Sequence, residues 1–129
     1  MSRVDKITPS LEDYIETMML MEENQPLRIT DIAEKMNVAK SSVHAAMEHL
    51  QERGLIVHEK YGVPALTEEG RRLGREVYER HTSLKTFFEK ILELDPETAG
   101  REACAVEHII SDDTIRKIAA FTRKYIGLK

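Results

Sequence analysis

The order of elements between residues 30 and 66 limits the possible folds of this chain more than any other feature of its sequence. Apolar side chains recur at helical spacing in residues 30–36 and again in residues 40–53. Residues 55–58 and 63–66 then have the apolar character of two short strands joined by a turn. Two helices followed by a hairpin predict a winged helix-turn-helix, in which the second helix enters the major groove of DNA. A plain helical hairpin is the alternative for the two helices alone.

The second helix of this pair has the composition that a DNA-reading helix requires. Its apolar residues lie on one face, and small or polar residues near its start let it approach the bases closely. The residues expected to contact base edges are Ser41, Ser42, His44 and Ala45. Further DNA contacts, mainly with phosphates, are expected from Arg3, Lys6, Arg28, Lys40, Lys60 and Tyr61.

The remaining sequence is helical in pattern and predicts a mainly α fold. Apolar spacing and capping residues indicate helices over residues 9–23, 67–92, 96–108 and 112–127. We therefore predict a winged helix-turn-helix DNA-binding domain over residues 1–72 and a helical dimerisation and metal-binding domain over residues 73–129. The last two helices bury little apolar surface alone, so a symmetric partner chain is the simplest cover for them.

The single cysteine belongs to a second informative pattern. Glu107 and His108 follow Cys104 at the third and fourth positions, so a helix would place the three side chains within an arc of about 100°. Sulfur, carboxylate and imidazole together form a recognisable set of metal ligands. A small buried cysteine beside a solvated Glu–His pair is the alternative.

Composition and charge limit the number of domains, the cellular compartment and the partners that the chain can have. The chain has 129 residues, which suits one domain or two very small ones, and its single cysteine suits the reducing cytoplasm. It has no apolar run long enough to cross a membrane and no signal-peptide pattern at its start, so no membrane partner is expected. The net charge of −4 weighs against DNA binding. Acidic and basic residues match in number between Pro26 and Val63, however, so the predicted DNA-binding segment is locally near neutral.

Several segments, in order along the chain, resemble one known family. These segments are Pro9–Glu16, Thr30–Ala33, Ser41–Val43, Leu66–Gly70, Arg80–His81 and Glu102–His108. They are similar to segments of the metal-dependent repressors of the diphtheria toxin repressor and manganese transport regulator family. The resemblance implies a homodimer that binds operator DNA when Fe(II) or Mn(II) is present and so shuts off metal uptake. It implies neither an enzymatic activity nor a small-molecule substrate. The length of the chain is similar to that of the manganese branch, which lacks the SH3-like domain of the iron branch.

The resemblance also implies a set of metal ligands from three parts of the sequence. They are Asp13, Glu16, His81, Cys104, Glu107 and His108. Without the resemblance, the acid pair on the first helix indicates an ordinary solvated face, and His81 indicates a histidine at the edge of the core. The acid pair matches the manganese branch, whereas Cys104 matches the iron branch. Lys85 and Gly100 stand where the iron branch has ligands of an ancillary site, which argues against a second site of that kind.

The donor types give a preference between the two ions. Carboxylates favour Mn(II), whereas a thiolate favours softer ions, so we expect Fe(II) or Mn(II) with a slight preference for iron. Zn, Co or Cd would bind in vitro without identifying the biological metal. Two alternative functions are a small metalloenzyme and a winged-helix regulator that responds to an organic ligand or a protein partner. No acid, base or nucleophile can be named for the enzyme, and the full set of donors argues against a loss of metal control.

Overall fold

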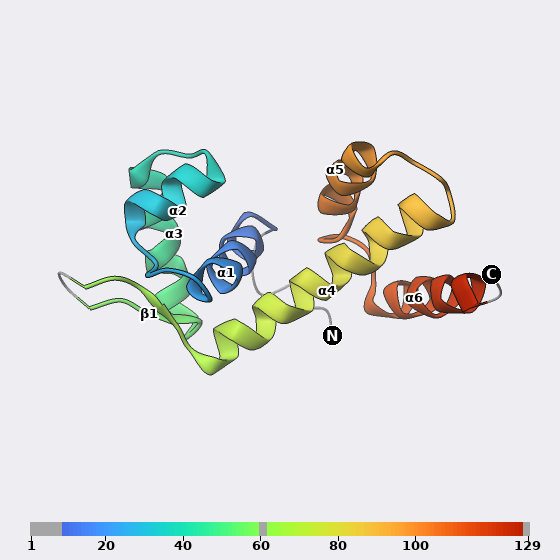
Figure 1. The fold of residues 1–129 in the computed structure, drawn as a ribbon. Helices are drawn as coiled ribbons and strands as arrows, with labels where there is room; N and C mark the ends of the chain where they lie inside the picture. The colour runs from blue at the N-terminus through green and yellow to red at the C-terminus, as the bar shows by residue number, and fades with distance from the viewer. Residues whose placement is uncertain (1–8, 60–61, 128–129) are drawn as a thin grey trace. The chain divides into compact units, whose positions relative to one another are not determined.

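The computed structural model describes residues 9–59 and 62–127, which form six helices and two short strands (Figure 1). In chain order these elements are α1 (Pro9–Glu22), α2 (Ile29–Met36), α3 (Lys40–Glu52), β1 (Ile56–Val57), β2 (Ala65–Leu66), α4 (Glu68–Lys90), α5 (Pro96–Val106) and α6 (Asp112–Gly127). The strands pair antiparallel, with Ile56 opposite Leu66. The prediction of a mainly α fold with an N-terminal winged helix-turn-helix is confirmed. Within the described ranges, no helix is both long and apolar enough to cross a membrane.

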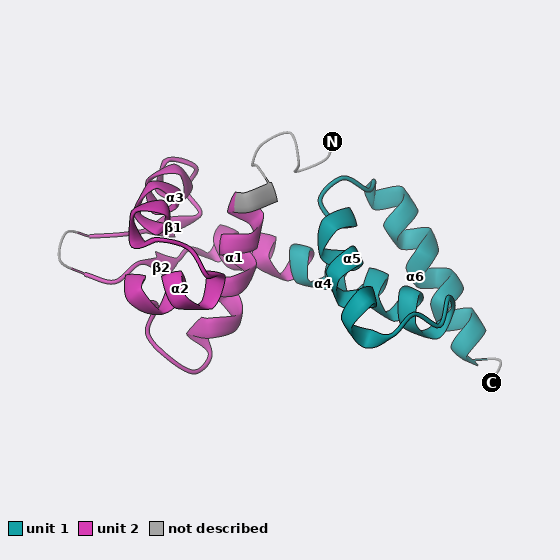
Figure 2. Cartoon of the chain, turned by 90° about the horizontal axis from the view of Figure 1, so that it is seen from above, with its two compact units in different colours: residues 1–7, 77–129 teal, residues 8–76 magenta. Residues whose placement is uncertain are grey.

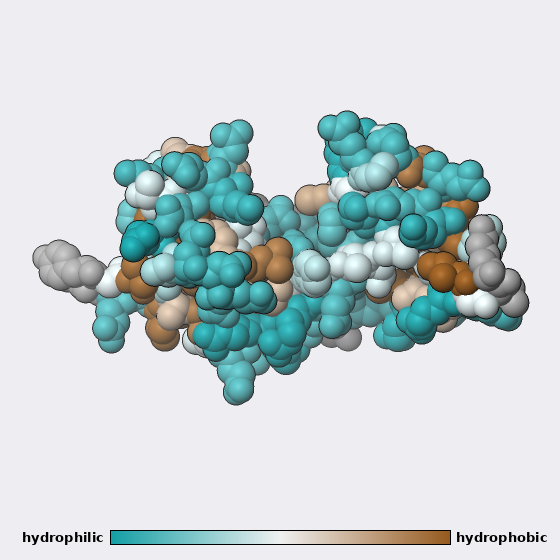
Figure 3. Space-filling model, viewed as in Figure 1, coloured by the Kyte–Doolittle hydropathy of each residue, from teal (hydrophilic) through white to brown (hydrophobic). Residues whose placement is uncertain are grey.

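The chain divides into two compact units (Figure 2). The N-terminal unit, residues 8–76, holds α1 to β2 and the first part of α4, and the C-terminal unit holds the rest of α4 with α5 and α6. The division thus falls inside α4, and the predicted domain boundary between residues 72 and 73 stays a prediction. On the face drawn in Figure 3, hydrophilic side chains cover most of the surface of each unit.

The core of the N-terminal unit is formed by its first three helices and the hairpin. Buried apolar side chains at helical spacing line the inner faces of the helices: Ile15, Met18, Ile32, Val43, Met47 and Leu50. The paired hairpin residues Ile56 and Leu66 are buried in the same unit. Asn37 ends α2 in the left-handed conformation, with φ 58°, and opens the tight turn to α3. This packing buries one face of α3 and leaves the other face to solvent.

The hairpin is tied to the start of α4 by hydrogen bonds. Thr67 Oγ1 donates to Gly54 O at 2.8 Å and accepts from the Gly70 N–H at 3.0 Å. The Thr67 N–H donates to Leu55 O at 3.1 Å. A Cβ on Gly70 would lie 2.1 Å from Leu55 O, so only glycine allows this approach of the helix to the loop.

In the C-terminal unit, three helices enclose a small apolar core. Leu84, Ala103 and Ile115, one from each helix, are buried at its centre. The partly buried residues around them are Phe88, Val106, Ile110 and Ile118. Asp95 caps α5 by accepting the Thr98 N–H at 2.9 Å, and this hydrogen bond lowers the pKa of the Asp95 carboxyl.

Replacing Gly70 with Ala tests the close approach of α4 to the hairpin. The added methyl would meet backbone rather than a flexible side chain, so G70A should lower the free energy of unfolding by about 2–3 kcal/mol. G100A is the matched control, because a Cβ there meets only the Lys85 side chain, at 3.4 Å or more. This control should gain about 0.5–1 kcal/mol from helix propensity. Urea unfolding followed by circular dichroism measures both, and equal stabilities would contradict the close approach.

Candidate metal centre

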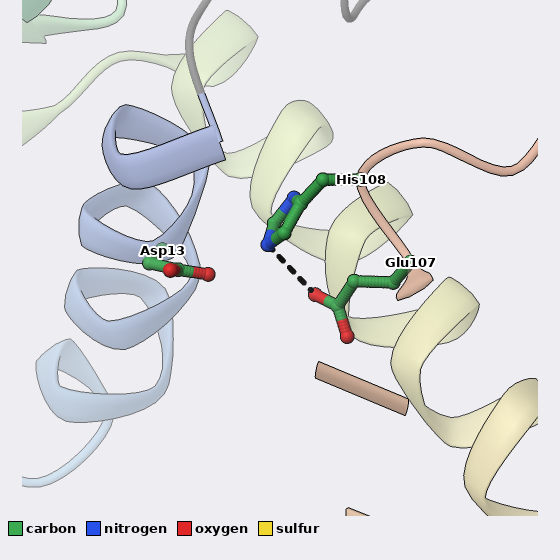
Figure 4. Close-up of side chains that lie close together, drawn as sticks. All are labelled: Asp13, Glu107 and His108. Carbon is green, nitrogen blue, oxygen red and sulfur yellow. Dashed lines mark ion pairs between the residues drawn. The ribbon is translucent and has the colours of Figure 1, made fainter. Parts of the chain in front are cut away.

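Glu107 is a carboxylate that the fold keeps out of water. Its side chain is 0% exposed and lies just after the last residue of α5. Its Oε1 lies 2.7 Å from His81 Nδ1. Its Oε2 lies 3.6 Å from His108 Nε2 (Figure 4) and, within the part of the chain that the structure describes, has no hydrogen-bond partner. Burial of such an oxygen is unfavourable unless a positive charge or a donor compensates it.

Two imidazoles flank this carboxylate. His81 extends from α4 and its side chain is 25% exposed, whereas the His108 side chain, in the turn after α5, is 6% exposed. Imidazole nitrogens and carboxylate oxygens are ligands that divalent transition metals accept. A cation would also compensate the Glu107 oxygen that lacks a hydrogen bond. The donors present here therefore fit a divalent cation.

The helix α5 ends earlier than the sequence pattern predicts. Its last residue is Val106, and residues 107–109 form a turn. Glu107 still has αR dihedral angles and donates its N–H to Ala103 O at 2.9 Å, so it continues the helical path of Cys104, and the predicted helix is too long only at His108. An arginine side chain from α4 donates to the backbone oxygens of Glu107 and Ile110, and these hydrogen bonds stabilise the segment after α5.

The alternative of a small buried cysteine beside a solvated Glu–His pair is wrong. Cys104 is exposed on α5 rather than buried. Glu107 and His108 are buried rather than solvated. The structure thus brings His81, Glu107 and His108 together and leaves Cys104 on an exposed part of the helix that leads into the turn.

The acid pair of the first helix belongs to the N-terminal unit. Asp13 and Glu16 lie about one turn apart on α1 and are partly buried. Figure 4 labels Asp13 on this helix. Glu12, which had no predicted role, is 0% exposed, and its spacing of three residues from the buried Ile15 is the signal that places it on the inner face. The assignment of Asp13 and Glu16 as metal ligands stays a prediction.

The residues of α3 that are expected to contact phosphates or base edges are accessible. Lys40, Ser41, Ser42, His44 and Ala45 are exposed in the first turns of α3. Arg28 is also exposed and lies 3.7 Å from Asp31. Arg3, Lys6, Lys60 and Tyr61 lie outside the described residues. The contacts of all these residues with DNA stay predictions.

Arg80 is a buried residue that the sequence-based predictions left without a role. It is 5% exposed, and its Nε donates to the backbone oxygen of Glu107 at 3.0 Å. The signal was its spacing, because it lies three residues after Val77 and four before Leu84 on the buried stripe of α4. An arginine on a buried stripe requires acceptors from the elements packed against it.

Comparison with known proteins shows matches along most of the chain. The family model described as "Iron dependent repressor, N-terminal DNA binding domain" matches residues 6–63. The model described as "Iron dependent repressor, metal binding and dimerisation domain" matches residues 67–125. An uncharacterised HTH-type transcriptional regulator of Methanocaldococcus jannaschii is 32% identical over 121 residues, which cover 92% of this chain and 97% of that protein. The HTH-type transcriptional regulator MntR of Bacillus subtilis is 37% identical over 112 residues, which cover 86% of this chain and 78% of that protein.

Solved structures share the fold. A manganese-dependent transcriptional repressor in complex with manganese matches with a TM-score of 0.79 and 28% identity, over 87% of this chain and 52% of that chain. The manganese regulator SloR matches with a TM-score of 0.79 and 27% identity, over 91% of this chain and 55% of that chain. This chain therefore spans about half the length of both structures.

Replacing Glu107 with Gln tests whether this carboxylate binds a cation. Gln keeps the size of the side chain but removes its charge. The affinity of the E107Q variant for Mn(II) should therefore fall. The decrease should exceed the roughly 10–100-fold loss that follows removal of a residue that only hydrogen-bonds to a ligand. E102Q, which changes an exposed glutamate on α5, is the matched control and should bind like the native chain. Isothermal titration calorimetry measures both, and equal affinities for the two variants would contradict the assignment.

Proposed function

Because this chain belongs to the iron-dependent repressor family, we propose that it is a transcriptional repressor that binds operator DNA as a homodimer when loaded with Fe(II) or Mn(II). It acts in the cytoplasm on genes of metal-ion uptake and is not an enzyme. The observation that carries the proposal is the buried Glu107 carboxylate between two imidazoles. The exposed start of α3 supports the DNA-binding part of the proposal.

The proposal includes six metal ligands: Asp13, Glu16, His81, Cys104, Glu107 and His108. The carboxylates favour Mn(II), and the Cys104 thiolate favours softer ions, so a slight preference for Fe(II) remains. A bound ion supplies positive charge that offsets the repulsion among the carboxylates. Glu107 supports this role most directly, since its buried Oε2 accepts no hydrogen bond from any described residue.

The proposed mechanism follows from the positions of the ligands in the two units. Asp13 and Glu16 lie on α1, which contacts α2 and α3 inside the N-terminal unit. His81, Cys104, Glu107 and His108 belong to the C-terminal unit. When the α1 carboxylates share a cation with the other donors, they favour the arrangement of units in which all donors meet, by the difference in metal affinity between arrangements. In a homodimer this sets the spacing of the two α3 helices, which must be about 34–36 Å apart to enter successive major grooves.

Removal of metal should release the operator. A duplex selected from random DNA by the loaded protein provides the target, and fluorescence anisotropy at fixed ionic strength measures its binding. EDTA should abolish specific binding, and Mn(II) or anaerobic Fe(II) should restore it. Restoration at a lower free concentration of Fe(II) would support the preference for iron, whereas a response to Mn(II) alone would contradict that preference. Unchanged affinity after chelation would contradict metal control and favour a winged-helix regulator that responds to an organic ligand or a protein.

Replacing Lys40 with Ala tests the assignment of α3 as the reading helix. Lys40 is exposed at the first position of α3, where its ammonium can reach a phosphate. K40A should weaken binding to all duplexes alike and reduce the slope of log affinity against log salt by about 1. K117A, which changes an exposed lysine of α6, is the matched control and should leave the slope unchanged. A change in sequence preference alone would contradict a phosphate contact for Lys40.

A further inference from the structure

We propose that Arg80 is a positioning residue of the candidate metal centre, whose guanidinium fixes the segment that presents Glu107 and His108. The inference rests on the proposed function, because it concerns the same metal site. It adds a residue that supplies no ligand atom and acts only through the backbone and through the start of α6.

The guanidinium of Arg80 binds three points of one short segment. Its Nε donates to Glu107 O at 3.0 Å. One terminal nitrogen donates to Ile110 O, and the other donates to the carboxylate of Asp112, the first residue of α6. The fork of donors therefore spans the whole connection between α5 and α6. Because Arg80 is 5% exposed, water competes little for these contacts.

Arg80 and His81 hold two different parts of the same glutamate. His81 Nδ1 lies 2.7 Å from the Glu107 carboxylate, and Arg80 Nε lies 3.0 Å from the Glu107 carbonyl oxygen. Neighbouring residues of α4 thus fix both the backbone position and the side-chain direction of Glu107. His108, the next residue along the chain, starts from the same fixed backbone. The contacts of Arg80 and His81 therefore position both donors, Glu107 and His108.

The end of α5 explains why this segment needs an arginine. The last carbonyl groups of a helix lack partners within the helix, and burying them unpaired is unfavourable. The C-terminal end of a helix also carries partial negative charge, which a guanidinium compensates. Lysine would supply the charge but could not donate from a planar fork to several acceptors at once.

Charge and position predict opposite results when Arg80 is changed. A positive charge near a cation site lowers cation affinity by Coulomb repulsion, so its removal alone would raise that affinity. Loss of positioning would instead lower the affinity, although the repulsion is gone. The Asp112 carboxylate already balances part of the Arg80 charge, which leaves positioning as the larger effect.

Two variants of the full chain, R80K and R80Q, test the inference with Mn(II) and Co(II) as probes. Calorimetry gives the Mn(II) affinity, the visible absorption of the Co(II)-loaded chain reports the ligand geometry, and thermal unfolding without metal reports the stability. R72K and R72Q are the matched controls, because Arg72 lies on the same helix and forms ion pairs with the exposed glutamates Glu69 and Glu76. Both Arg80 variants should lose about 10–100-fold in Mn(II) affinity and change the Co(II) spectrum, while the controls change neither.

The outcomes separate this inference from the proposed function. If the native chain binds neither Mn(II) nor Co(II), the metal site itself is wrong. If the native chain binds and a folded R80K or R80Q binds equally well with an unchanged Co(II) spectrum, the positioning role is wrong. A higher affinity in R80Q would show that charge dominates, and would also overturn it. Failure of both variants to fold without metal would assign Arg80 to the general stability of the unit and overturn the positioning role as well.

Discussion

A carboxylate removed from water has to be compensated by the groups around it, and much of the C-terminal unit serves this requirement at Glu107. The helix α4 supplies His81 to one carboxylate oxygen and Arg80 to the backbone. The end of α5 at Val106 turns the chain so that His108 lies beside the other oxygen. Packing of α4, α5 and α6 around Leu84 holds Arg80, His81 and His108 near Glu107. One oxygen of Glu107 accepts no hydrogen bond from the described residues, so its burial is not fully compensated. A bound cation would supply the missing compensation.

The packing of the N-terminal unit holds α3 in place and leaves one of its faces exposed. Its core buries the inner face of α3, and the bonds of Thr67 to the loop before the hairpin fix the start of α4 against the same unit. Because α1 packs in this unit, a force on the α1 carboxylates acts on the unit as a whole rather than on one loose helix. If Asp13 and Glu16 bind metal as we propose, the ion acts on α3 through the packing of this unit.

Local patterns determined what the sequence could predict. Helical periodicity and turn residues found the winged helix-turn-helix, the long α4 and the Asp95 cap, because these features depend on neighbours within a few residues. The end of α5 could not be found in this way, since the contacts that stabilise its terminal turn come from Arg80, almost thirty residues earlier. The same local patterns could not show that Glu107 and His108 are buried while Cys104 is exposed. The donor residues were chosen by chemistry and family resemblance, which identify candidates but do not fix the ion they hold.

The central claim is that donors of α1 and donors of the C-terminal unit bind a common cation. Diffraction from crystals of the manganese-loaded chain, recorded where manganese scatters anomalously, tests it most directly. We expect an anomalous peak within bonding distance of Glu107 and His108 and of at least one carboxylate of Asp13 or Glu16. A fully occupied peak bound by the C-terminal unit alone, with both α1 carboxylates turned to solvent, would contradict the claim.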